Sequence, residues 1–276
     1  MVALLLQPLT FAQSRPPITG ISHIAVYASE ATNAEHFYSH DIGLIKGGDP
    51  EDPRGARYYV NPAQFVEVLP LLLEDSPSRV DHWAYTTTDA ESLRVYLAAR
   101  GVTVPTRVEH GSDGSLWFRI KDPEGNIVEF VQLPPHPSPI SRANPIGNHI
   151  IHVGMQVRNR DAAETFYRDI LGFRPYWFGG QDPDKVDWVS LQVPDGSDWL
   201  EYMLVGVSTP NGAPIAAIQT ELGTLNHLSI GVKNMEEAVT TLDSEGRLDN
   251  EHVGPKIGRD GSGNSIFMIR TGLGWN

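Results

Sequence analysis

The sequence has no cysteine among its 276 residues. Disulfide bonds, thiolate metal sites and a cysteine nucleophile are therefore all excluded. If the chain binds a transition metal, histidine and carboxylate side chains must supply the ligands.

Basic residues are also scarce. There are 21 Lys and Arg against 34 Asp and Glu, so the formal net charge is -13. A nucleic-acid binder needs a concentrated Lys and Arg surface, which this sequence lacks, and we therefore expect no nucleic-acid partner. The hydrophobic fraction of 40% is typical of a globular protein, and the length allows two domains of ordinary size.

No apolar run is long enough to cross a bilayer. The first residues, MVALLLQPLTFAQSRPP, contain a run of about ten apolar residues, half of what a spanning helix needs. This run is similar to the apolar core of a secretory signal with cleavage near Ala12, although the basic start is missing. We treat residues 1–17 as a candidate signal or leader segment. The protein would be periplasmic or secreted if this is a signal and cytoplasmic otherwise, with no membrane association after leader removal.

Four segments of the chain begin alike, each with a histidine in third place and alternating apolar residues that predict a strand. They read ISHIAVYA from Ile21, VDHWAYTT from Val80, IIHVGMQV from Ile150 and LNHLSIGV from Leu225. Each is followed by helical apolar spacing that ends near a glycine, at Gly43, Gly101, Gly172 and Gly246, and then by shorter β-like runs. The repeated unit is therefore β-α-β-β-β.

A proline-rich stretch separates the second unit from the third. We predict a domain over residues 18–134, a linker over 135–146 and a second domain over 147–276. Three strands after each helix favour a mixed, mostly antiparallel sheet and an α+β fold. The fourth unit stops at the TGLGWN turn, so we expect the second domain to lack its last strand.

Strand alternation predicts which side chains share a face. On the first strand Ile21, His23 and Ala25 should point one way, and on the unit's last strand a carboxylate, Glu67, interrupts an apolar run. A buried carboxylate is costly unless it is paired or coordinated. The pattern recurs and gives seven candidate metal ligands: His23, Glu67, His82, Glu129, His152, Glu201 and His227. Such ligands suit Fe, Mn, Ni, Co or Zn.

Three motifs carry a family resemblance: HVGMQVRNRDAAETFYRDILGF from His152, HIAVYASEATNAEHFYSHDIGL from His23, and KDPEGNIVEF ending at Phe130. From about residue 20 onward the chain resembles the vicinal oxygen chelate superfamily of glyoxalases, bleomycin resistance proteins and extradiol dioxygenases. The resemblance implies two tandem domains with U-shaped sheets around a metal. Glyoxalase I-like members use the quartet His23, Glu67, His82 and Glu129, which implies a lyase or isomerase acting through an enediolate. Glu129 is then the first candidate for the base and Glu67 the second.

Two alternatives stay open. Extradiol dioxygenases hold iron in the second domain, where His152 and His227 match, but their third ligand would fall just beyond Asn276. In the first domain His110 matches a dioxygenase histidine, whereas Arg119 replaces the expected tyrosine. A non-catalytic, antibiotic-binding protein is the other alternative. All three imply a small-molecule partner, and the chain could act as a homodimer. The histidines without a repeat partner should lie on the surface, and they are His36, His40, His136, His149 and His252.

Overall fold

The computed structural model describes residues 14–71, 79–135, 146–180, 182, 184–204, 225–247, 258–259 and 265–269. The predicted linker, apart from its two ends, and the closing TGLGWN turn lie outside these residues, as does most of the leader segment. Among the described residues, no helix combines the length and the apolar character needed to cross a bilayer.

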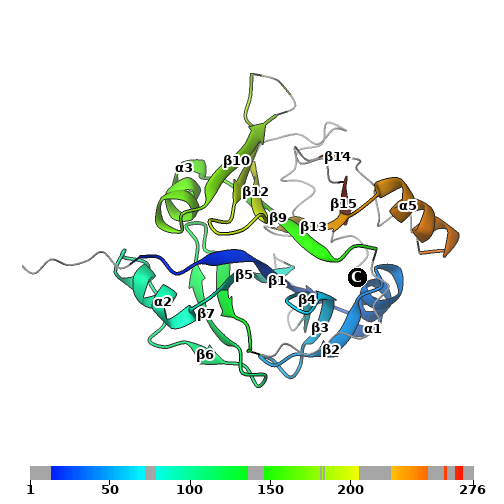
Figure 1. Cartoon of the computed structure of the whole chain (residues 1–276), viewed down its shortest axis with the longest axis horizontal. Helices are drawn as coiled ribbons and strands as arrows, with labels where there is room; N and C mark the ends of the chain where they lie inside the picture. The colour runs from blue at the N-terminus through cyan, green and yellow to red at the C-terminus, as the bar shows by residue number, and fades with distance from the viewer. Residues whose placement is uncertain are drawn as a thin grey trace, which may run out of the picture.

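Three of the four predicted β-α-β-β-β units are complete, and the described part of the fourth has two strands after its helix (Figure 1). The first consists of β1 (Ile18–Ala28), α1 (Ala31–Glu35), the π-helix η1 (His36–Asp41), β2 (Ile45–Gly48), β3 (Ala56–Asn61) and β4 (Gln64–Pro70). The second consists of β5 (Val80–Thr87), α2 (Ala90–Ala98), β6 (Glu109–His110), β7 (Leu116–Lys121) and β8 (Ile127–Gln132). Each helical segment ends at the predicted glycine, which adopts a positive φ: 80° at Gly43 and 79° at Gly101.

The second half of the chain repeats this order. The third unit consists of β9 (His149–Val157), α3 (Arg160–Glu164), the π-helix η2 (Thr165–Ile170), β10 (Arg174–Gly179), β11 (Trp188–Gln192) and β12 (Trp199–Leu204). The fourth contributes β13 (Leu225–Val232), α5 (Met235–Ser244), β14 (Gly258–Arg259) and β15 (Ser265–Ile269). Gly172 and Gly246 again end the helical segments with φ of 83° and 66°.

The strands form two mixed sheets, one from each half of the chain. The first has the order β2-β3-β4-β1-β5-β8-β7-β6 and the second β10-β11-β12-β9-β13-β15-β14. In the first sheet β1 pairs antiparallel with β5, and each pairs in parallel with the last strand of its own unit. In the second sheet the neighbour of β13 is β15, which pairs with it antiparallel. The equivalent neighbour in the first sheet is β8, which pairs in parallel with β5. The predicted α+β class with mixed, mostly antiparallel sheets is confirmed.

A β-bulge precedes the histidine of every unit. Opposite β5 the pairing of β1 skips Ser22, and opposite β1 the pairing of β5 skips Asp81. The pairing of β9 with β13 skips Ile151 and Asn226 in the same way. Bulges bend a strand and re-aim its side chains.

The bulge overturns one detail of the predicted strand faces. Simple alternation places Ile21 on the same face as His23, but Ile21 packs instead in the apolar core with Ile24. The extra residue Ser22 shifts the alternation by one position. On β4 the predicted alternation is confirmed, because Val66, the neighbour of Glu67, belongs to the core.

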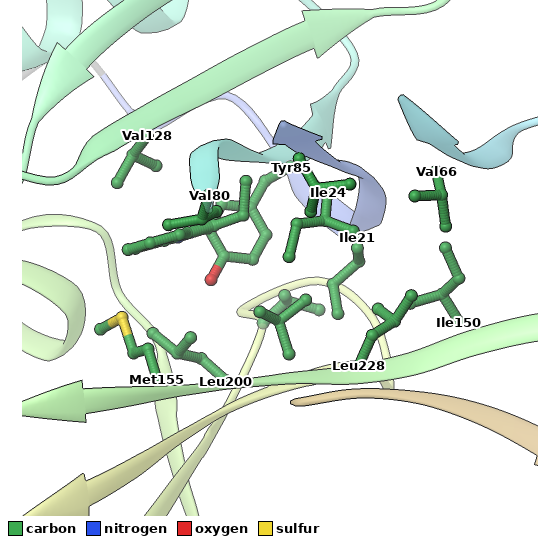
Figure 2. Close-up of a cluster of buried hydrophobic side chains, with 14 of the residues drawn as sticks. Ile21, Ile24, Val66, Val80, Tyr85, Val128, Ile150, Met155, Leu200 and Leu228 are labelled. Carbon is green, nitrogen blue, oxygen red and sulfur yellow. The ribbon is translucent and has the colours of Figure 1, made fainter. Parts of the chain in front are cut away.

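The apolar faces of the two sheets pack on one another and share one core (Figure 2). Ile24, Val66 and Val128 from the first sheet face Met155 and Leu200 from the second. The metal-ligand candidates point away from this core, and therefore each sheet has its own polar face. Because the core is common to both halves, neither half buries its apolar face alone.

Buried polar side chains fix the two halves in register. Gln64 donates from Nε2 to the carbonyl of Ile150 (3.0 Å) and accepts at Oε1 from the amide of the same residue (2.9 Å). Asp198, in the second half, accepts a hydrogen bond from the amide of Ile21 in the first half (2.8 Å). Its other carboxylate oxygen bonds to His149 (2.6 Å). Loss of either side chain leaves buried backbone groups without a partner, which is costly.

We expect Gln64→Ala to lower the free energy of unfolding by about 1–3 kcal/mol, because it leaves both backbone groups of Ile150 unpaired. Chemical denaturation followed by tryptophan fluorescence and circular dichroism measures the change. Gln192→Ala is the matched control, because Gln192 is partly exposed and bonds locally to the carbonyl of Ser197 (2.9 Å). Its effect should stay within about 0.5 kcal/mol. Equal effects of the two substitutions would show that the Gln64 contact does not stabilise the interface.

Candidate metal centres

Four predicted ligands of the first half converge at one buried point. The Nε2 atoms of His23 and His82 lie 2.9 Å apart. Glu129 approaches each of these nitrogens to 3.5 Å, and Glu67 approaches that of His23 to 3.6 Å. All four side chains are at most 1% exposed. We call this group the N-terminal cluster.

The N-terminal cluster has the chemistry of a divalent cation site. Burial lowers the pKa of His23 well below its usual value and that of His82 to about 4, so both rings are neutral and can offer nitrogen lone pairs. Burial also raises the pKa of Glu67 to about 9 and that of Glu129 to about 8. One oxygen of each carboxylate is buried without a hydrogen-bond partner. Metal–nitrogen bonds of about 2.0–2.1 Å at a right angle would separate the nitrogens by about 3 Å, which fits the His23–His82 spacing.

The bulge residues of this half orient both rings. Ser22 Oγ lies 3.1 Å from Nδ1 of His23, and Asp81 Oδ2 lies 2.7 Å from Nδ1 of His82. Burial alone would raise the pKa of Asp81, but the hydrogen bonds from His82 and Tyr27 and the nearby Arg119 lower it to about 2. Hydrogen bonding at Nδ1 leaves Nε2 of each histidine directed into the cluster, the usual way in which an outer carboxylate orients a metal-binding histidine.

Two arginines lie across the sheet from the two glutamates. Arg57 on β3 pairs with Glu67 on β4, and Arg119 on β7 pairs with Glu129 on β8. Arg119 Nε donates to Glu129 Oε2 at 2.6 Å. We did not assign a role to either arginine from the sequence, although hairpin pairing of these strands could have placed each one opposite its glutamate. Glu51, in the loop between β2 and β3, was also missed, and its carboxylate lies within 4.8 Å of ligand atoms of His23 and Glu67.

The three predicted ligands of the second half form a C-terminal cluster. The Nε2 atoms of His152 and His227 lie 2.6 Å apart, and Glu201 approaches them to 3.9 Å and 3.3 Å. Burial lowers the pKa of His152 to about 3. The bulge residue here is Ile151, which has no polar group, and His152 Nδ1 is buried without a hydrogen-bond partner.

The C-terminal cluster differs from the N-terminal one in the residues around it. Ser190, not an arginine, lies across the strand from Glu201, and Ser229 Oγ lies 3.0 Å from His152 Nε2. An aromatic ring two positions before the glutamate is common to both sites. Phe65 stacks on His23 at 4.4 Å between centroids, and Trp199 stacks on His152 at 4.7 Å.

The other histidines follow the surface prediction in part. His36 and His40 are exposed, as predicted, and His110, which matched a dioxygenase histidine, is exposed as well. His149 is partly buried and bonds to Asp198, because it begins β9 where the two halves meet. His136 and His252 lie outside the described residues.

Comparisons with known proteins agree with this architecture. Residues 151–262 match the sequence model of the Glyoxalase/Bleomycin resistance protein/Dioxygenase superfamily. No curated protein matches the chain in sequence.

Solved structures with the same fold include both kinds of enzyme. The 2,3-dioxygenase LapB from Pseudomonas sp. KL28 is similar with a TM-score of 0.62 and 16% identity, covering 94% of each chain. The Mn(II)-bound glyoxalase from Novosphingobium aromaticivorans gives a TM-score of 0.67 and 20% identity over 94% of this chain and 80% of that one. Homoprotocatechuate 2,3-dioxygenase from Brevibacterium fuscum, in complex with 3,4-dihydroxyphenylacetate, is similar with a TM-score of 0.67 and 13% identity. The match covers 97% of this chain and 80% of that one.

The two sheets, the four repeated units and the sequence match together confirm the family resemblance. Residues 151–262 are similar in sequence to the Glyoxalase/Bleomycin resistance protein/Dioxygenase superfamily, and the chain as a whole has the fold of two tandem vicinal oxygen chelate domains.

Proposed function

We propose that the N-terminal cluster is the active site of a divalent-metal-dependent lyase or isomerase of glyoxalase I type, acting on a small oxygen-chelating substrate. The observation that carries the proposal is the convergence of two neutral imidazoles and two carboxylates, each with an unsatisfied oxygen, at a buried point. A bound divalent ion would polarise a substrate carbonyl and stabilise the charge of an enediolate. Ni, Zn, Co, Mn and Fe all suit this ligand set.

The contacts of the two glutamates suggest different roles for them. Glu129 is held by Arg119 at 2.6 Å, and this contact stabilises its charged form and weakens it as a base. Glu67 Oε2 has no hydrogen-bond partner. A carboxylate that is free to take a proton near its operating pH makes the better general base. We therefore propose Glu67 as the group that moves the proton next to the carbonyl, with Glu129, the first choice from the sequence, as a fixed ligand.

Loss of a ligand should first affect the metal. We expect His23→Ala and Glu129→Gln to remove the metal held by the N-terminal cluster, as measured by mass spectrometry of purified protein, with an unchanged circular dichroism spectrum. His110→Ala is the matched control because this histidine is exposed and lies outside both clusters, and it should retain the metal of the unsubstituted protein. Full metal content in both ligand variants would refute the N-terminal assignment.

The two glutamates can be separated by aspartate substitutions, which keep the charge and withdraw the carboxylate by one methylene. In metal-saturated protein assayed on the hemithioacetal of methylglyoxal and glutathione, Glu67→Asp should lower kcat by about 10²–10⁴-fold, because proton transfer depends on reach. Glu129→Asp should act mainly on metal affinity. A larger fall in kcat for Glu129→Asp would reverse the two roles.

The C-terminal cluster favours a second candidate, an extradiol dioxygenase using Fe(II) and O2. Two histidines and one carboxylate, with open positions, are the ligand set of non-haem iron oxygenases. Fe(II)-loaded protein should then consume O2 with catechol, and His227→Ala should abolish this uptake. Ni, Zn or Co in purified protein would instead support the lyase, and no metal at all would support a binding protein.

A further inference from the structure

The loop between β2 and β3 closes the N-terminal cluster. It begins after Gly48 and crosses to the loop before β7, where the carbonyl of Pro50 accepts from the amide of Ser112 at 3.1 Å. Figure 1 shows these two loops meeting at the open end of the first sheet. The ligands beneath are at most 1% exposed. The carboxylate of Glu51, from this loop, is part of what closes the cluster to solvent.

Glu51 points from the loop into the site. Its side chain is 2% exposed although the residue lies on the surface loop. One carboxylate oxygen pairs with Arg57, and the other lies 3.5 Å from Nη2 of Arg119. The same carboxylate comes within 4.8 Å of ligand atoms of His23 and Glu67. It therefore lies between two cations and the place where a metal would bind.

We propose that Glu51 occupies the position of the substrate's own carboxylate, and that the substrates are small 2-oxo or 2-hydroxy acids. This inference rests on the proposed function and specifies its substrate class. When the loop opens, the carboxylate of the acid replaces that of Glu51 beside the arginines, and its neighbouring oxygen faces the metal ligands. Arg119 is the main residue that binds the substrate carboxylate, because its side chain is 31% exposed. The side chain of Arg57 is only 4% exposed and also pairs with Asp49 at 3.2 Å.

Charge favours a carboxylate as the incoming group. Carboxylates outnumber guanidiniums around the cluster even without Glu67 and Glu129, since Arg57 and Arg119 face Glu51, Asp49 and Asp81. Replacing one carboxylate with another leaves the local charge unchanged. A phosphate would add a second negative charge to a buried site that already has an excess, which is unfavourable.

Anion binding by the full-length protein tests the proposal. The affinity for pyruvate is measured by isothermal titration calorimetry, with and without bound Mn(II). Glu51→Ala should bind pyruvate at least about tenfold more tightly than the unsubstituted protein, because an internal competitor has been removed. Pyruvamide, the neutral amide, should show no such gain. Asp52→Ala is the matched control: Asp52 lies in the same loop and pairs with the exposed Arg54. The gain in Glu51→Ala should disappear when Arg119→Gln is added.

The outcomes separate this inference from the proposed function. If Glu51→Ala binds pyruvate more tightly in the metal-free protein, and this increase in affinity requires Arg119, the carboxylate site is supported even if no metal-dependent activity is found. Unchanged pyruvate affinity in Glu51→Ala, or a gain that survives Arg119→Gln, overturns the inference and leaves the metal centre standing. Glu51→Gln, which keeps the shape and removes the charge, should behave as Glu51→Ala does. It decides the question if the alanine variant does not fold.

Discussion

The structure depends on the cost of burying two histidines and two glutamates where β1 and β5 pair. Away from water, His23 and His82 lose their protons, while Glu67 and Glu129 have carboxylate oxygens without hydrogen-bond partners. Such a cluster is unfavourable by itself and favourable around a cation. The apolar core behind the sheet, shared between both halves, supplies the rigidity that holds these side chains together.

The β-bulges connect this electrostatic requirement to the backbone. Each one inserts a residue directly before a histidine, so that the ring turns to the polar face while its neighbours remain in the core. In the first half the inserted residues Ser22 and Asp81 also contact Nδ1 of the histidine that follows. In the β9 strand the inserted Ile151 cannot do so. The bulge residues therefore orient both rings in the first domain, whereas His152 in the second domain lacks this contact.

Much of this was predictable from the sequence, because histidines and glutamates recur in register with the strand period. The four units, the glycine helix ends and the convergence of the seven ligand candidates into two clusters all follow from that pattern. Alternation failed at Ile21, since a bulge shifts the period without a distinctive residue to mark it. Glu51 could not be found in this way, because its position depends on how an irregular loop folds across two units.

The two domains show how one scaffold acquires two electrostatic environments. At equivalent positions across from the first glutamate of each domain stand Arg57 and Ser190, a cation and a small hydroxyl. With arginines and an inward carboxylate, the N-terminal cluster can exchange one anion for another at constant charge. The C-terminal cluster has Ser190 where its counterpart has Arg57, and Ser229 where its counterpart has the apolar Ala84. Repeated strands and bulges therefore hold equivalent histidines and glutamates in both domains, while the residues that flank them give each cluster a different charge.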